Sequence, residues 1–111
     1  MAKYISMIMV NAKEGQEDEL NAWLNDYHLP EVLQTEGYRS LQRYVLAPGE
    51  EGNPKATHKY IHFFEIETDD LEKTKAALNA GRATRTPTSP ALDTSTVSAL
   101  FFKAFGEKLT K

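Results

Sequence analysis

The sequence predicts one α+β domain whose elements follow the order strand, helix, strand, strand, helix, strand. Its 111 residues fit a single domain, residues 1–111, and the 41% hydrophobic and 26% charged composition is ordinary for a soluble globular protein. Alternating apolar patterns and helix start and stop residues define the elements. The strand-like segments are 3–11, 38–46, 58–67 and 95–105, and the helical ones are 17–28 and 69–80.

The first strand and the first helix set the pattern for the rest. Residues 3–11 are apolar on both alternating faces, which is typical of a strand that is covered on both sides. One face of the helix that follows carries Leu20, Trp23, Leu24 and Tyr27. Pro30 is expected to end this helix, to push Leu29 out of the α region and to open a further helical turn over 31–34. His28 would then stand at a helix C-terminus beside an apolar face.

The second and third strands mix polar and aromatic residues. In the segment 38–46, alternation puts on one face Tyr38, Ser40, Gln42 and Tyr44. The opposite face carries Arg39, Leu41, Arg43 and Val45. In the segment 58–67, one face carries His58, Tyr60, His62, Phe64 and Ile66.

The second helix has recognisable ends. Asp69 and Glu72 form a capping-box pattern at its start, and Gly81 is expected to adopt a left-handed conformation after its last turn. Residues 82–93, with two prolines and no periodicity, are predicted to form a loop or a short helical turn.

This order of elements is the ferredoxin-like split βαβ arrangement, with a four-stranded antiparallel sheet and two helices on one face. The other face of the sheet would be too apolar for a monomer in water, because strands 3–11 and 95–105 are apolar on both sides. A homodimer with its two sheets face to face is therefore expected. Inward-facing polar and aromatic side chains would line a cavity between sheet and helices, suited to a small hydrophobic molecule.

Composition excludes several classes of function. The absence of cysteine rules out disulfides, thiolate metal sites and a cysteine nucleophile. A net charge of −3 gives no reason to expect nucleic acid or a membrane as partner, and no apolar run approaches the roughly 20 residues of a membrane span. No signal peptide, phosphate loop, nucleophile elbow or acidic metal cluster is visible. We expect a cytoplasmic protein without metal or cofactor.

A family resemblance follows from several short motifs. They are Trp23 and His28-Leu29-Pro30-Glu31 on the helix, Gly37-Tyr38, Arg43-Tyr44, Tyr60, and Phe64-Glu65-Ile66 before Asp69-Asp70. This set resembles the dimeric α+β barrel superfamily, and its EthD-like branch most closely. The resemblance covers about residues 3–78 and the fourth strand. It implies a fold shared by cofactor-free monooxygenases, cyclases, dehydratases, isomerases and haem-degrading enzymes.

His28 is the first candidate for chemistry. Its imidazole titrates near neutral pH and can exchange a proton at the mouth of a cavity walled by Trp23 and Tyr27. The alternative is a structural cap, in which the ring binds a terminal carbonyl or Glu31.

His62 and Tyr60 are the next candidates, and Tyr44 with Gln42 would complete a polar wall that orients a carbonyl or phenol. His62 is expected to face Tyr44 or Gln42 across the sheet. The alternatives are an interior histidine with satisfied hydrogen bonds and ordinary cross-strand aromatic pairing. His58, about 13 Å along the strand, cannot share a metal with His62 and reads as a solvated residue.

Other charged residues have two interpretations each. Arg43 either pairs with a carboxylate or binds an anion, and Glu65 is expected to pair with Arg39 or Arg43. Arg82 and Arg85 either close over an acidic substrate or belong to a solvated loop. A haem-degrading site would use Asn11, Trp23 and His28, an arrangement that matches that subfamily poorly.

The resulting prediction is a cofactor-free enzyme that acts on a hydrophobic aromatic or polyketide-like carbonyl compound. Its reaction would be proton transfer, as in isomerisation, cyclisation or dehydration, or oxygenation. His28, His62 and Tyr60 would be catalytic, and the substrate would contact Trp23, Tyr27, Tyr44 and Gln42. The alternative is a dimeric binding or accessory protein without catalysis.

Overall fold

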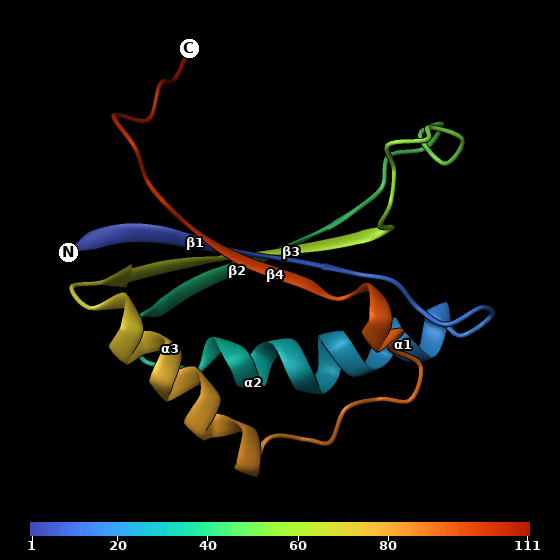
Figure 1. The fold of residues 1–111 in the computed structure, drawn as a ribbon, viewed down its shortest axis with the longest axis horizontal. Coiled ribbons are helices and arrows are strands. Elements are labelled where there is room, and N and C mark those ends of the chain that lie inside the picture. Colours follow the sequence, from blue (N-terminus) through green and yellow to red (C-terminus); the bar gives the residue numbers. More distant parts are fainter.

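The computed structural model describes residues 1–111 and confirms the ferredoxin-like α+β fold (Figure 1). A four-stranded antiparallel sheet in the order β2-β3-β1-β4 is built from β1 (Ala2–Val10), β2 (Tyr38–Val45), β3 (Tyr60–Thr68) and β4 (Ser98–Lys103). All helices lie on one face: α1 (Glu17–Trp23), a π-helical turn (Leu24–His28), α2 (Leu29–Leu33) and α3 (Leu71–Ala80). None of these helices has the length and apolar character that a membrane crossing requires.

The core lies between the sheet and the helices. From the sheet it takes Val10, Tyr38, Tyr60, Phe64 and Ile66, and from the helices Leu20, Trp23, Leu24, Leu29 and Val32. Two polar side chains of the sheet, Ser6 and His62, are buried among these apolar groups, with exposed fractions of 2% and 1%. Such buried polar side chains need partners, so they mark the part of the core where function is to be sought.

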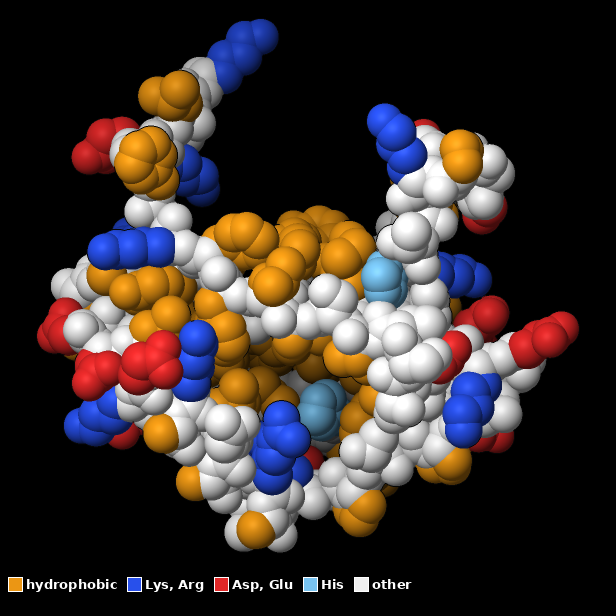
Figure 2. Space-filling model, in the orientation of Figure 1, with side chains coloured by type: hydrophobic (Ala, Val, Ile, Leu, Met, Phe, Trp, Pro, Cys, Tyr) orange, Lys and Arg blue, Asp and Glu red, His pale blue; other side chains and the backbone are white.

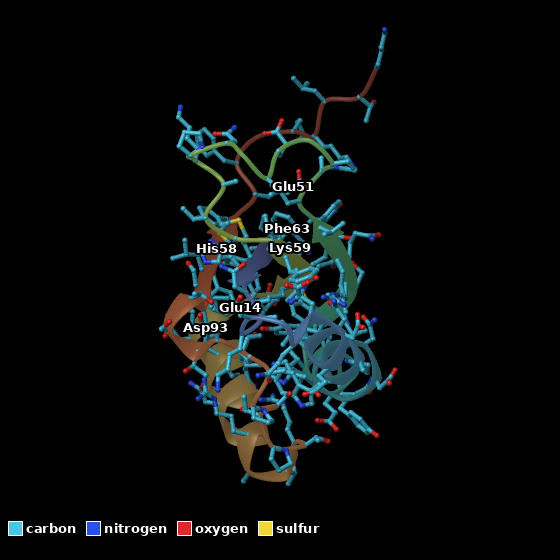
Figure 3. All side chains as sticks on the ribbon, turned by 90° about the vertical axis from the view of Figure 1, so that its right-hand side faces the viewer. Glu14, Glu51, His58, Lys59, Phe63 and Asp93 are labelled. Atoms are coloured by element: carbon cyan, nitrogen blue, oxygen red, sulfur yellow. The ribbon has the colours of Figure 1, made fainter.

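The opposite face of the sheet is open and apolar. Antiparallel register places on it Ile5, Met7, Met9, Tyr44, Ile61, Phe63, Leu100 and Phe102. We call this set the open face. The loop 46–59 and the C-terminal tail both project from this side of the sheet (Figure 1). In Figure 3, Phe63 lies below the loop that carries Glu51, whereas Glu14 and Asp93 lie toward the helices.

The first helix does not end at Pro30, which corrects the prediction. Leu29 keeps α-helical angles (φ −70°, ψ −42°) and its N–H donates to the Leu24 carbonyl, five residues back. The wider π-helical turn accommodates a proline that has no N–H and whose ring would crowd an α-helical turn. Because that turn contains an additional residue, Tyr27 rotates to the outside, where it is 52% exposed.

Strand β2 also departs from simple alternation. The register shifts between Tyr38 and Ser40, so that Tyr38 stays buried while Arg39 is accommodated in the irregularity. From there on, Leu41 and Arg43 face the helices, and Arg43 lies opposite His62. A bulge of this kind changes which side chains share a face.

Helix α3 differs from expectation at both of its ends. Asp70, rather than Asp69, caps the helix, and its carboxylate accepts from the Lys73 N–H at 3.1 Å. Gly81 is not left-handed (φ −70°), because the chain continues as a 3-10 turn over Gly81–Thr84. Residues 85–93, which we call the strap, then run back toward β1 and bridge it through Ala12 and Leu92. A second 3-10 turn, Thr94–Thr96, leads into β4.

Candidate functional site

The π-helical turn positions His28. Its ring stacks on Trp23 with centroids 4.5 Å apart and an interplanar angle of 14°. Burial lowers the pKa of His28, and the charges of Arg85 and Arg82 lower it further, while Glu31 opposes them. The ring takes part in none of the side-chain hydrogen bonds of the structure, so the predicted capping role is not seen. At neutral pH His28 is therefore an uncharged imidazole with free nitrogens.

His62 lies in the middle of β3 and is held by Arg43. The Arg43 Nε–H donates to His62 Nδ1 at 3.4 Å, and its other nitrogens donate to Asn25 Oδ1 and Asn21 Oδ1, each at 2.7 Å. Burial, followed by the charges of Arg43 and His28, lowers the pKa of His62 to about 4, opposed by a contact with the Ile61 backbone. His62 is thus neutral, and its proton sits on Nε2 because Nδ1 accepts a hydrogen bond.

The Nε2 atom of His62 is the one buried side-chain polar atom without a hydrogen-bond partner. A buried N–H without an acceptor costs about 1–3 kcal/mol, so native structures usually satisfy such groups. An oxygen atom supplied by a ligand would satisfy it. This is the strongest single indication of a binding site in the molecule.

Two hydroxyls of the sheet, those of Ser6 on β1 and Tyr38 on β2, flank His62 on the strand between them. Burial raises the pKa of Tyr38, while the charge of Arg85 and a hydrogen bond from Ser6 lower it. Tyr38 is therefore a neutral phenol, packed edge to face against Phe64 with ring centroids 5.2 Å apart. It can donate a hydrogen bond but cannot serve as a base at neutral pH.

The strap is held by hydrogen bonds to residues of all three α-helices. Thr86 donates to Glu31 twice, from N–H at 2.8 Å and from Oγ1 at 2.7 Å, and the Pro87 carbonyl accepts from Trp23 Nε1 at 3.0 Å. The hydrogen bonds from the Thr86 side chain and backbone lower the pKa of Glu31. Arg85 reaches the other way, donating from Nη2 to the Leu78 carbonyl of α3 at 2.8 Å.

Figure 2 shows a hollow on this face with a histidine side chain at its base, in the region where Figure 1 shows the helices and the strap. Two cavities lie elsewhere. One, of about 470 Å³, adjoins the start of α3, and the other, of about 690 Å³, lies between the C-terminal tail and the neighbouring ends of the four strands. Neither is lined by His28 or His62.

The structure brings together three of the seven predicted site residues: Trp23, His28 and His62. Tyr60 is buried beside them, but its hydroxyl accepts from Asn21 Nδ2 at 3.1 Å and its ring lies 5.7 Å from the Arg43 guanidinium carbon. It supports the Arg43 network.

The other three predicted residues do not join this group. Tyr27 is exposed on the outside of the π-helical turn, so it does not form a wall of the cavity. Tyr44 and Gln42 lie on the open face, where Tyr44 packs against Phe63 at 5.5 Å between ring centroids. They were expected to face His62, but the bulge in β2 gives that place to Arg43.

The prediction from sequence did not include several residues that surround His28 and His62 in the structure. Ser6 could have been noticed as the one serine in an otherwise largely apolar strand. Arg43 depends on the bulge, and Glu31 with Thr86 depends on the path of the strap, neither of which periodicity reveals.

Glu65 and His58 have ordinary structural roles. Glu65 accepts from the Ser40 hydroxyl at 2.6 Å, and it forms no ion pair with Arg39 or Arg43, contrary to expectation. His58 is not simply solvated, because its ring bonds Thr57 Oγ1 at 2.9 Å and the Thr96 carbonyl at 2.6 Å. The structure contains no group of three or more side chains that could hold a metal ion.

Comparison with known proteins shows the fold. No family model and no curated protein matches the chain. Solved structures do match: a proposed monooxygenase from Shewanella loihica PV-4 is 12% identical, with 96% of this chain and 99% of that chain covered and a TM-score of 0.63. MhuD with two manganese protoporphyrin IX molecules bound per active site is 15% identical, with coverages of 96% and 99% and a TM-score of 0.62.

An EthD family protein from Bacillus halodurans C-125 is 10% identical, with 98% of this chain and 100% of that chain covered and a TM-score of 0.57. Dimeric ferredoxin-like proteins are also among the matches. The chain therefore has the ferredoxin-like fold that the resemblance to EthD-like proteins implies.

Proposed function

We propose that this protein binds a small aromatic carbonyl compound between the sheet and the helices and transfers protons to and from it through His28. The observation that carries the proposal is the buried His62 Nε2–H, which has no acceptor in the protein. A carbonyl oxygen is an acceptor of the required kind, and the flat Trp23–His28 stack is suited to an aromatic body.

The chemistry follows from two neutral imidazoles with different surroundings. His28, whose ring nitrogens are free, would remove a proton from the carbon next to the carbonyl. The electron pair of that C–H bond moves to the carbonyl oxygen, where the His62 Nε2–H stabilises the resulting enolate. Protonated His28 then returns its proton to another carbon or to a leaving hydroxyl, which completes an isomerisation or a dehydration.

Oxygenation without a cofactor is the second candidate reaction, supported by the fold-level likeness to a proposed monooxygenase. Its first step is the same deprotonation, after which the carbanion or phenolate would give electrons to dioxygen. Both reactions require His28 to be unprotonated.

Haem chemistry fits the residues less well. The Asn11 side chain is engaged at both ends, donating to the Thr57 carbonyl at 2.9 Å and accepting from the Lys59 N–H at 2.8 Å. It is thus tied to the start of β3 and is not free to join Trp23 and His28 around a haem face.

The proposal includes a homodimer in which two open faces pack together. Leu100 and Phe102 are 49% and 45% exposed in a single chain, and the open face that they share spans all four strands. Apolar patches of this extent mark association surfaces. Figure 2 shows hydrophobic side chains gathered between the projecting loop and the tail, which would flank the partner.

The alternative function is binding without catalysis. The two are separated by hydrogen–deuterium exchange at the acidic C–H groups of 2-tetralone, a probe ketone, followed by NMR in D₂O. We expect the protein to accelerate exchange and His28→Ala to lower the acceleration by about 10²–10⁴-fold. The rate should rise with pH through a midpoint below 6.5, because only neutral His28 accepts a proton.

Asp26→Asn, on the same turn, is the matched control and should leave the rate unchanged. Equal exchange with and without His28 would refute its acid–base role. Binding of the ketone without any acceleration would favour the accessory protein.

A further inference from the structure

Three guanidinium groups, those of Arg43, Arg82 and Arg85, act on the histidines of the site. None of them forms an ion pair. The ion pairs of the structure lie elsewhere and join the Met1 amine to Asp69, Lys59 to Glu17, and Lys75 to Glu72. The hollow is therefore positively charged, although the chain as a whole has a net charge of −3.

The nearest carboxylate does not neutralise this charge. The negative charge of Glu31 raises the pKa of His28, so this carboxylate lies within electrostatic range of the imidazole. Both of its oxygens, however, accept hydrogen bonds from Thr86. They are directed at the strap, and although the charge of Arg85 helps to lower the pKa of Glu31, no ion pair joins the two side chains.

Arg43 is not free to bind a ligand. Its guanidinium contacts His62, Asn21 and Asn25, all of which are neutral acceptors. It acts on a ligand only through His62, which it holds in the Nε2–H tautomer, and is thus a positioning residue.

Arg85 is free in a way that Arg43 is not. It is half-buried and uses one N–H, on the Leu78 carbonyl, which leaves most of the five donors of the guanidinium without a protein acceptor. Among the charges that act on His28 and Tyr38, that of Arg85 is the largest in each case. Arg85 also directly precedes Thr86 and Pro87, which bond Glu31 of α2 and Trp23 of α1, so its charge lies beside the Trp23–His28 side of the hollow.

Gly81 makes room for this conformation. A Cβ at Gly81 would lie 2.7 Å from Arg85 Nη2, so any side chain there would displace the guanidinium. Since Gly81 is not left-handed, backbone conformation does not explain a glycine at this position. The position of the Arg85 guanidinium directly over Gly81 does explain it.

We propose that Arg85 selects an anionic ligand, so that the compound preferred in the hollow carries a carboxylate or an acidic phenol on its aromatic body and binds more tightly than a neutral ketone. This inference rests on the proposed function. The aromatic body would lie against the Trp23–His28 stack, with one oxygen at His62 Nε2–H and the negative charge at Arg85. A half-buried guanidinium that forms no ion pair and has donors without acceptors binds such an anion through charge-assisted hydrogen bonds.

Two probes with the same ring system separate charge from shape: 2-naphthoate, an anion, and 2-acetylnaphthalene, a neutral ketone. Binding is followed by NMR at the His28 and His62 ring protons and the Trp23 indole N–H. We expect naphthoate to bind at least about tenfold more tightly than the ketone. It should also raise the pKa of His28, because a nearby anion favours the imidazolium, whereas the ketone should not.

Arg85→Gln should abolish the preference and the rise in the pKa of His28 while the ketone still binds. Gly81→Ala keeps the charge but displaces the side chain, and should give a reduced preference. Arg39→Gln, which removes an arginine far from the hollow, is the control and should retain the preference of the unaltered protein.

The outcomes separate the two proposals. If both probes shift the site signals with equal affinity, or if Arg85→Gln retains the preference, the assignment of Arg85 is wrong and the binding site stands. If neither probe shifts the signals of His62 and Trp23, the binding site itself is refuted and the role of Arg85 with it.

Discussion

The two faces of the sheet depart from simple patterning in opposite directions. The centre of the face under the helices is apolar except for Ser6, His62 and Arg43. Apolar side chains in these places would pack without the loss of hydration that buried polar groups suffer. The open face is apolar where water would favour polar side chains. The first departure is explained by chemistry with a small molecule and the second by association with another chain, because each costs stability in an isolated monomer.

Adjacent residues make this comparison direct. Phe63 and Phe64 are consecutive in β3, yet Phe64 is fully buried under the helices and Phe63 lies on the open face. The same is true of Ile61 and His62.

The largest expected effect comes from truncating these two phenylalanines separately. Phe64→Ala should lower the free energy of unfolding by about 3–5 kcal/mol at every protein concentration, because it leaves a cavity in the core. Phe63→Ala should cost less, and its cost should grow with protein concentration as the dimer forms. Urea denaturation at two concentrations checks this, and a concentration-independent loss in Phe63→Ala would argue against the dimer.

The next effect is a pH dependence that belongs to the covered face alone. The pKa of His62 is about 4 in the folded state and about 6.5 when unfolded, so between these values the unfolded chain binds more protons. Stability is fully present above pH 6.5 and should fall by about 3 kcal/mol as the pH drops to 4. His28, whose pKa is also lowered, contributes in the same direction.

Denaturation at a series of pH values, compared with His62→Gln, tests this. The variant should show a shallower dependence between pH 4 and 6.5. An unchanged slope would mean that His62 is not the group that titrates.

A smaller effect is expected from placing a charge on the open face. Leu100→Glu should raise the dimer dissociation constant by at least about tenfold, because an unpaired carboxylate would be buried between the two sheets. Sedimentation equilibrium measures this, and the circular dichroism spectrum should stay unchanged. Ala76→Glu, on the exposed side of α3, is the matched control. Identical association of both variants would place the interface elsewhere.

The smallest effect concerns the strap. Thr86→Val removes the hydroxyl that donates to Glu31 but keeps the backbone N–H. We expect faster exchange at the backbone amides of Arg85, Thr86 and Thr88 and no measurable change in the unfolding midpoint, since strap opening is local. Thr88→Val, in the same segment without that bond, should leave exchange unaltered. A shifted midpoint would show that the strap belongs to the cooperative core.

The sequence was sufficient for the fold because periodicity and chain breaks determine it. The two-sided apolar pattern of 3–11 and the polar turns predicted the strands, their order and the apolar second face. It also indicated His28 and His62 as candidates, because they are conspicuous titratable residues in apolar surroundings. Arg43 was placed on the wrong face because one irregularity at Arg39 reverses the alternation after it.

Tyr27 was placed wrongly for a related reason. Helical periodicity assumes 3.6 residues per turn, and the π-helical turn breaks that assumption at the point where Pro30 demands it. The anchoring of the strap through Thr86 and Pro87 depends on contacts more than fifty residues apart. No local pattern encodes such contacts.

The π-helical turn can also be regarded as a phase correction. The buried residues of α1 and those of α2 are separated by one residue more than continuous α-helical periodicity allows. The wide turn takes up this residue, so that both sets face the sheet. Deleting one residue among 25–27 would give an ordinary helix with both stripes still aligned, whereas adding one would rotate α2 by about 100° and expose Leu29 and Val32. His28 thus stands beside the one stretch of this helix that tolerates a change in chain length, and in one direction only.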